Sequence, residues 1–223
     1  MYKGLAKTMR TITELVDNDD PGFPLVLEWV NAAVRPVEIL PPGVSRADEL
    51  VRVQVTTRSP MGAIVYETGG ILIDYGWLRF LGSGHKRITR TLAGWNEGRS
   101  DGFYLVADDA VGGFFAMNGG ALGPDMKNVY YFAPDTLKWE PLKLGYSDFL
   151  RWACSERLDL FYEWIRWPGW ETDVARLHGD RCYSFFPFLF TKEGSGGRGD
   201  RRDIPADESW GFQMDMLQQL GGA

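Results

Sequence analysis

The sequence reads GAIVYETGGILIDYGWLRFLGSG at residues 62–84 and DGFYLVADDAVGGFFAMNGG at residues 101–120, and these two stretches decide the fold class. Both contain short runs of apolar and aromatic residues broken by paired glycines, which is the pattern of strands joined by turns. Residues 103–107 and 113–117 form the clearest hairpin, because the Asp and Gly residues between them suit turn conformations. We therefore expect an antiparallel meander at the centre of the chain.

The strand pattern extends outward from this hairpin in both directions. The other strand predictions are residues 37–40, 71–75, 77–81, 129–132 and 138–142, with a bend at Gly76. This spacing predicts a meander of four to six strands. Upstream of it, Val51, Val53 and Val55 alternate with polar residues, which also favours a strand.

Helix signals stand on both sides of the meander. The clearest is Ser59-Pro60, a capping serine followed by proline at the first helical position, with Gly69-Gly70 as the stop. Further helices are expected at residues 10–18, 23–33, 45–50, 88–96, 148–167 (with a break), 171–177 and 207–220. YSFFPFLF at residues 183–190 is dense in aromatics, and its Pro187 excludes a regular central strand. Residues 193–203 (EGSGGRGDRRD) predict a flexible loop.

The order of elements from Ser59 to Ala153 is similar to that of a known superfamily. The cues are ETGGILID, WLRFLGSG, GWN, FYLVADDAVGGFFAMN, VYYFAPDTLKWEPL and YSDFLRWA. They resemble the SUKH superfamily, which includes yeast cell-wall regulators and many bacterial immunity proteins. With WPGW and the later PADESW added, the chain most closely resembles an uncharacterised bacterial family, domain of unknown function 2625.

The resemblance implies an α+β fold, with helices packed on a curved, mostly antiparallel sheet. Together with the helix predictions it divides the chain into a SUKH-like domain at residues 1–167 and a helical C-terminal extension at residues 168–223, packed on the same domain. The resemblance also implies that the protein binds other proteins rather than catalysing a reaction. It gives no catalytic residues that could be assigned to positions of this chain.

Composition and charge restrict the class of protein. With 44% hydrophobic and 24% charged residues, the chain of 223 residues has the composition of a globular protein. Its net charge of −6 argues against nucleic acid binding and suits a basic protein partner. No apolar run is long enough to span a bilayer and no secretory signal opens the chain, so we expect a cytoplasmic protein without membrane contact. Cys154 and Cys182 are too few for a zinc site, so we expect free thiols, no metal and no cofactor.

Groups suited to catalysis are sparse. His85 follows Gly82-Ser83-Gly84 and would act as a base only if Asp74 approached it in space, so we favour an exposed loop histidine. Ser83 lacks the spacing of a nucleophile elbow, and the glycine turn lacks the lysine of a phosphate-binding loop. His178 is expected to stabilise the C-terminal end of a short helix. We therefore expect no catalytic residues and no enzyme activity.

The candidate partner-binding residues are Trp77, Arg79, His85, Asp108 and Asp109. Trp77 and Arg79 share one face of a strand if the period is two, and both residue types are enriched at binding hot spots. A core position for Trp77 is the alternative. Adjacent acids point in different directions along an extended chain, which disfavours a shared metal at Asp108 and Asp109. We expect these two acids to form a solvated edge at a turn.

Three hypotheses about function follow. The leading one is a cytoplasmic immunity protein, which would neutralise a toxin, such as a basic toxin domain, by stoichiometric binding. The second is a housekeeping regulatory or scaffold protein of the same fold, and the third is a small-molecule enzyme that uses His85. The oligomeric state stays open at this point.

Overall fold

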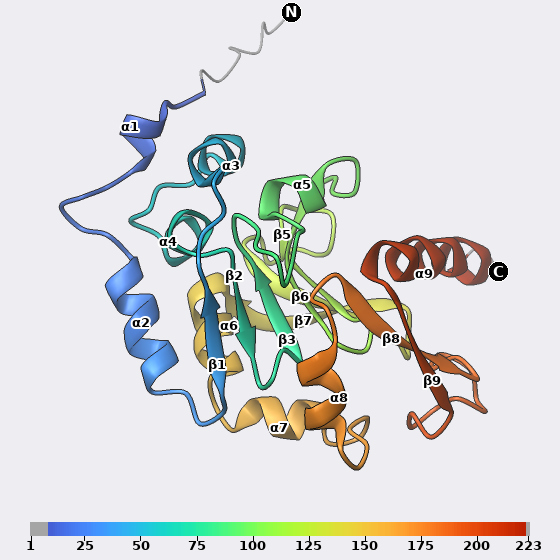
Figure 1. Cartoon of the computed structure of the whole chain (residues 1–223). Helices are drawn as coiled ribbons and strands as arrows, with labels where there is room; N and C mark the ends of the chain where they lie inside the picture. The colour runs from blue at the N-terminus through green and yellow to red at the C-terminus, as the bar shows by residue number, and fades with distance from the viewer. Residues whose placement is uncertain (1–8, 222–223) are drawn as a thin grey trace, which may run out of the picture.

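In the computed structural model, which describes residues 9–221, the chain folds around a seven-stranded antiparallel sheet (Figure 1). The strands are β1 (Val37–Leu40), β2 (Gly70–Ile73), β3 (Leu78–Leu81), β4 (Phe103–Asp109), β5 (Phe114–Asn118), β6 (Asn128–Ala133) and β7 (Lys138–Gly145). Each strand pairs with the next one in the sequence, so the spatial order runs from β1 to β7. Residues 1–8, the first part of the segment searched for a secretory signal, lie outside the described residues.

The prediction of an α+β protein with an antiparallel sheet is confirmed. The predicted hairpin is present, and the strands predicted at residues 129–132 and 138–142 pair as a second hairpin. In the first hairpin, Phe103 of β4 lies opposite Asn118 of β5, and Asp108 lies opposite Phe114. The sheet has one strand more than the largest meander expected, because β1 pairs with β2 and extends the sheet edge.

The helices within residues 9–221 are α1 (Ile12–Leu15), α2 (Phe23–Asn31), α3 (Arg46–Val53), α4 (Pro60–Glu67), α5 (Leu92–Asn96), α6 (Tyr146–Ala153), α7 (Arg157–Tyr162), α8 (Trp170–Arg176) and α9 (Ala206–Gly221). Ser59 caps α4 as predicted, because its hydroxyl accepts a hydrogen bond from the Gly62 amide at 3.1 Å. The strand predicted around Val53 is wrong. Helix α3 continues to Val53 and ends at Gln54, whose φ is 59°. Burial of Leu50 on this helix outweighs the short alternating pattern of valines.

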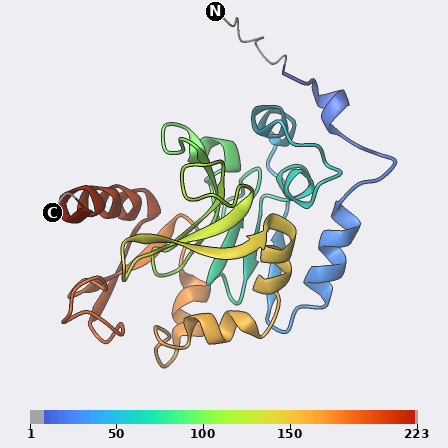
Figure 2. The same ribbon diagram turned by 180° about the vertical axis from the view of Figure 1, so that it is seen from behind.

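Helix α6 covers one face of the sheet (Figure 2). Its Phe149 ring packs against Phe80 of β3 and Phe115 of β5, at 4.9 and 4.8 Å between ring centroids. Full burial of such a side chain stabilises the fold by about 1.5–3 kcal/mol. Cys154, which follows this helix, is a buried free thiol as expected, and burial raises its pKa to about 11.

Residues 168–221, here called the C-terminal unit, contain a second, two-stranded sheet as well as helices α8 and α9. This sheet pairs β8 (Arg181–Phe186) with β9 (Asp200–Pro205). Strand β8 ends immediately before Pro187, as the proline predicts. The predicted loop at residues 193–203 is partly strand, because residues 200–203 pair with β8. The hairpin and α9 lie on the side of the main sheet away from α1–α4 (Figures 1 and 2).

Hydrogen bonds hold the C-terminal unit against the main sheet. The Tyr183 amide donates to the Ala110 carbonyl at 2.7 Å, which ties β8 to the turn between β4 and β5. The Arg79 guanidinium, from β3, donates to the Arg181 carbonyl at 2.5 Å. The second sheet is therefore anchored to the first at its centre. Among the described residues, no helix has both the length and the apolar character that crossing a bilayer requires.

Candidate functional site

Two of the predicted partner-binding residues, Arg79 and Asp108, belong to a buried ion network. Arg79 and Asp108 are each 1% exposed, and Arg79 Nε donates to Asp108 Oδ1 at 2.6 Å. Arg90 pairs with Asp108 and also with Asp180, whose Oδ1 lies 3.1 Å from Arg90 Nε. Burial lowers the pKa of Arg90, but Asp108 and Asp180 more than offset this and raise it. The network is balanced in charge and joins the main sheet to the C-terminal unit.

Asp109 is fully buried and closes the turn between β4 and β5. Its Oδ1 accepts hydrogen bonds from the amides of Val111 at 3.0 Å and Gly113 at 2.7 Å. Its Oδ2 accepts from the hydroxyls of Tyr131 at 2.9 Å and Tyr162 at 2.8 Å. The expected solvated acidic edge is therefore wrong, because both acids are enclosed by groups that satisfy them. Burial raises the pKa of Asp109, although these hydrogen bonds act in the opposite direction.

The raised pKa of Asp109 predicts a pH dependence of stability. At pH values between 3.8, the ordinary pKa of aspartate, and the raised pKa of Asp109 in the folded protein, the native protein binds more protons than the unfolded chain. Asp109 therefore contributes most to stability at pH values below 3.8, and this contribution is lost as the pH rises through the native pKa. Relative to wild type, Asp109→Asn should gain stability as the pH rises above about 4, because the amide does not ionise.

Urea unfolding of both proteins across this pH range measures the effect. Asp125→Asn is the control, because hydrogen bonds from Tyr130 and Asn128 lower the pKa of that carboxyl, so this variant should show no gain in stability as the pH rises above about 4. A constant stability difference between Asp109→Asn and wild type at all pH values would contradict the assignment.

Trp77 is also in the interior, which is the alternative that the sequence left open. Its ring packs against Trp170 at 5.0 Å, Tyr162 at 5.3 Å and Trp167 at 5.6 Å between centroids. The Arg166 guanidinium lies 5.0 Å from the Trp77 ring and pairs with the buried Asp74. Trp77, Arg79, Asp108 and Asp109 thus have no exposed surface with which to contact a partner in this conformation.

The structure does not assemble acid–base machinery around His85. The ring is half-buried, and its Nδ1 accepts a hydrogen bond from the Arg87 amide at 3.2 Å. Asp74, the carboxylate that the sequence offered as a partner, is bound to Arg166 instead. His178 lies beyond the end of α8, with Nε2 at 2.9 Å from the Lys86 carbonyl oxygen.

Ser83 has a structural role in the glycine turn. Its hydroxyl donates to the Thr68 carbonyl at 2.8 Å and accepts from the Gly43 amide at 2.9 Å. A Cβ at Gly82 would lie 2.5 Å from the Thr68 carbonyl oxygen, so close packing of backbone requires glycine there. Among the described residues, no group of three or more His, Cys, Asp or Glu side chains could hold a metal ion.

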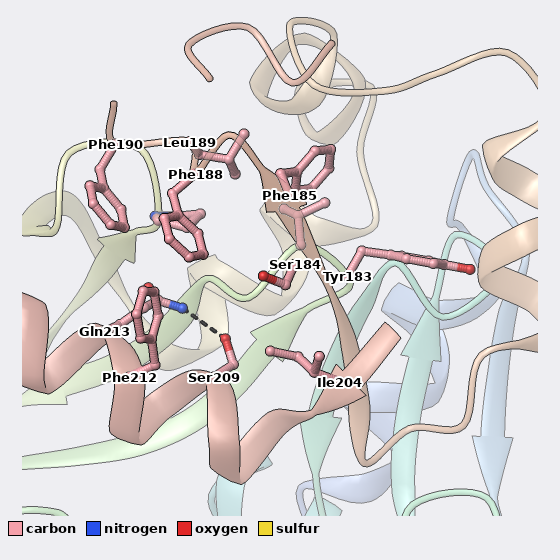
Figure 3. Close-up of a pocket in the computed structure, with 12 residues that line it drawn as sticks. Tyr183, Ser184, Phe185, Phe188, Leu189, Phe190, Ile204, Ser209, Phe212 and Gln213 are labelled. Carbon is pink, nitrogen blue, oxygen red and sulfur yellow. Dashed lines mark hydrogen bonds between the residues drawn. The ribbon is translucent and has the colours of Figure 1, made fainter. Parts of the chain in front are cut away.

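An aromatic cluster on the C-terminal unit is the best candidate for a functional site. We call it the C-terminal aromatic site and define it by Phe185, Phe186, Phe188, Phe190, Phe212 and Arg202. Figure 3 shows Phe185, Phe188, Phe190 and Phe212. Phe188 stacks on Phe190 with 5.4 Å between centroids and contacts Phe212 of α9 at 4.8 Å. Phe186 is 69% exposed at the edge of this cluster. Phe188, Phe190 and Phe212 are partly buried, and an exposed aromatic beside such rings is a feature of binding surfaces.

Two adjoining hollows open at this site. The wider one has a volume of about 410 Å³ and includes Phe186 and Arg202 in its walls. The narrower one, of about 30 Å³, is lined by Phe190, Phe212 and Gln213. Both share Ser184, Phe185 and Phe188 as lining residues. The volume of the wider hollow lies within the range of about 300–1,000 Å³ that is typical of ligand sites.

Gln213 lines the narrow hollow, and two hydrogen bonds fix its side-chain amide. Its Nε2 donates to the Gly112 carbonyl at 2.8 Å and to the Ser209 hydroxyl at 2.9 Å. Figure 3 shows the second of these bonds. These two bonds fix the amide orientation, because the Gly112 carbonyl requires a donor. Oε1 accepts no hydrogen bond within the described residues, although the side chain is almost fully buried. An unsatisfied buried acceptor costs about 1–3 kcal/mol, and this oxygen is enclosed by the surrounding atoms in this conformation.

The surroundings of the site are basic, in contrast to the chain as a whole. Residues 192–202 carry four basic side chains and two acidic ones, in a protein with a net charge of −6. Arg201 lies over the Trp167 ring at 4.1 Å, whereas Arg202 is exposed and makes no ion pair within residues 9–221. Because Ser184 lies opposite Arg202 and Phe186 opposite Asp200, these side chains share one face of the hairpin.

Sequence reasoning identified the aromatic density at residues 183–190 but did not propose it as a site. The signal was present, since an aromatic run interrupted by Pro187 does not suit a buried central strand. The contribution of Phe212 and Gln213 was not visible, because α9 meets this run only in the folded chain.

The fold and site define an α+β protein with a buried polar centre and an exposed aromatic site at its C-terminal unit. Comparison with known proteins places the chain in a family: the model described as "Protein of unknown function DUF2625" matches residues 12–209, and the chain belongs to this family. The match agrees with the narrower of the two resemblances read from the sequence.

Two relatives extend over most of the chain. The uncharacterized protein YbfG of Escherichia coli (strain K12) is 44% identical over 214 residues, covering 94% of this chain and 98% of the relative. An uncharacterized protein of Haemophilus influenzae is 39% identical over 189 residues, covering 81% of this chain and 83% of the relative. No solved structure shows a significant match.

Proposed function

We propose that this protein is a protein-binding module whose contact surface is the C-terminal aromatic site. The observation that carries the proposal is the exposure of Phe186, which is 69% accessible beside the stacked rings of Phe188 and Phe190. Aromatic and arginine side chains are the residue types that dominate protein interfaces. The same site contains no arrangement of nucleophile and base, which favours binding over catalysis.

A finer version of the proposal is an immunity protein of the SUKH type, acting in the cytoplasm by stoichiometric binding of a toxin. It is supported by the resemblance of residues 59–153 to that superfamily and by the antiparallel sheet with helices packed on it. The alternative is a housekeeping scaffold that uses the same surface for a cellular partner. The local basic charge favours an acidic segment of the partner at this site, whatever the charge of the rest of the partner.

Phe186→Asp should weaken partner binding by at least about ten-fold, because the variant replaces the most exposed ring of the aromatic site by a charge. The measurement is affinity capture of the tagged protein from its native host, followed by titration of the purified partner. Co-expression with each toxin encoded beside the gene then separates immunity from a scaffold role. Protection that depends on Phe186 indicates immunity.

Leu160→Asp is the matched control, because Leu160 of α7 is 68% exposed and lies away from the site. This variant should bind the partner as wild type does. Equal binding by Phe186→Asp and Leu160→Asp would show that the aromatic site is not the contact surface.

A further inference from the structure

We infer that a second copy of this chain binds at the C-terminal aromatic site, in a two-fold symmetric dimer. The contact surface, here called the hairpin face, is defined by Ser184 and Phe186 of β8 and by Asp200 and Arg202 of β9. The inference goes beyond the proposed function, because it concerns the protein without its partner and can be tested without one.

The four side chains of the hairpin face lie on the same side of the two strands. Ser184 is opposite Arg202 and Phe186 is opposite Asp200, and residues two apart on a strand point to the same face. Phe186, Asp200 and Arg202 are exposed, and Ser184 is half-buried. The hairpin of β8 and β9 lies at the periphery of the molecule, so a second copy can approach it (Figures 1 and 2).

The charges of the hairpin face are complementary to those of a second, antiparallel copy of the same face. Asp200 and Arg202 are two residues apart on β9, and neither makes an ion pair within residues 9–221. When two β9 strands face each other in antiparallel orientation, Asp200 of one copy faces Arg202 of the other, and two-fold symmetry repeats this pair. A wholly acidic or wholly basic partner would instead place a like charge against one of these two residues. The pair of opposite charges therefore favours a second copy as the occupant.

The hairpin face also has a protruding ring and a hollow that fit each other. Phe186 is 69% exposed, the largest exposed fraction among the large hydrophobic residues of the C-terminal unit. In the antiparallel arrangement Phe186 of one copy lies over Ser184 of the other, because Phe186 and Ser184 exchange places along the strand. Ser184 has a small side chain and lines the hollow of about 410 Å³, so the ring has room there. Two-fold symmetry buries both rings, and burial of apolar surface stabilises the dimer.

The free edge of β9 is a poor alternative contact. Strand β9 reads DRRDIP at residues 200–205, so four of its six residues are charged and one is proline. Charged residues and proline on an edge strand oppose edge-to-edge pairing with another chain. The dimer therefore forms through the hairpin face rather than through a continuous sheet.

Sedimentation velocity of the full-length protein, from micromolar to millimolar concentration, measures the dimer. We expect wild type to show a monomer–dimer equilibrium that depends on concentration. Phe186→Asp should weaken the dimer by at least about ten-fold, whereas Leu160→Asp, at an exposed position of α7, should dimerise as wild type does. Monomeric wild type over the whole range, or a dimer that Phe186→Asp leaves unchanged, would overturn the inference.

The variants Asp200→Arg and Arg202→Asp test the charge pairing. Each reversal places like charges against each other twice per dimer, so each variant alone should self-associate at least about ten-fold more weakly than wild type. An equimolar mixture of the two variants should form a heterodimer, because every charge at residues 200 and 202 again faces an opposite one. If the mixture stays monomeric at concentrations where wild type dimerises, this pairing is wrong.

The dimer covers the surface that the proposed function assigns to the partner, so the second copy and the partner compete for it. The two proposals nevertheless fail separately. If wild type is monomeric but Phe186→Asp loses the partner, the dimer is wrong and the partner surface stands. If Phe186→Asp weakens the dimer but binds the partner as well as Leu160→Asp does, the dimer stands and the proposed function fails.

Discussion

Replacing Arg79 by methionine should lower the free energy of unfolding by about 3–5 kcal/mol, because it leaves Asp108 as a buried carboxylate with one partner fewer. Arg79 also donates to the carbonyls of Asp109 and Arg181, and both acceptors would lose this donor. The second of these bonds connects β3 to β8. We therefore also expect faster amide exchange at Tyr183, whose hydrogen bond to Ala110 anchors the same strand.

Urea denaturation measures the stability, and Arg87→Met supplies the control. Arg87 is ion-paired with Glu38 at the surface, where such a pair contributes about 0–1 kcal/mol. The double variant Arg79→Met with Asp108→Asn should lose less than the sum of the two single variants, because the two groups interact directly. Additive losses in this cycle, or a loss below about 1 kcal/mol for Arg79→Met, would show that the buried pair has no such role.

The meander was predictable because its signals are local. Glycine-bounded runs with strand composition mark β2 to β5, and Pro134-Asp135 separates the runs of β6 and β7. The turn residues between β4 and β5 fix which of those strands pair. Ser59 and Pro60 mark the start of α4 for the same reason. The segment around Val53 was not predictable in this way, since a short alternation fits either a strand or the last turn of a helix. Burial of Leu50 against the core favours the helix. Burial depends on contacts with residues distant in the sequence, so a short window of sequence does not reveal it.

The candidate site was less predictable than the fold. Asp108 and Asp109 have the composition of a solvated turn, and only the folded chain brings Arg79, Arg90 and the two tyrosine hydroxyls around them. The aromatic run at residues 183–190 was visible, but exposure of Phe186 depends on its place at the end of a two-stranded sheet. Residue type alone does not separate a core aromatic from an interface aromatic.

The buried network and the exposed site are mechanically connected. Arg79 binds the carbonyl of Arg181, the first residue of the strand that ends in Phe186, and Arg90 pairs with Asp180 immediately before it. Gln213 ties α9 to the Gly112 carbonyl in the turn that Asp109 closes. A rigid support of this kind reduces the entropy lost when a partner binds. The polar centre therefore explains how an aromatic site near the end of the chain keeps a defined shape.

Trp77→Ala should lower the free energy of unfolding by about 3–5 kcal/mol, because it removes a fully buried ring at the junction of the sheet and the C-terminal unit. The ring contacts Tyr162, Trp167 and Trp170, and it lies beneath the Arg166 guanidinium. The resulting cavity would also bring water to the buried pair of Arg166 and Asp74. Urea denaturation monitored by circular dichroism measures the loss.

Two variants separate ring packing from other effects of removing a tryptophan. Trp77→Phe should lose less than about 2 kcal/mol, because it keeps an aromatic ring and Nε1 of Trp77 makes no hydrogen bond within the described residues. Trp164→Ala, at a position that is 39% exposed, should change stability by less than about 1 kcal/mol. If Trp77→Ala lost no more than Trp164→Ala, Trp77 would not be part of the core. The hot-spot role that its residue type suggested would then have to be considered again, because only a side chain that leaves the core can contact a partner.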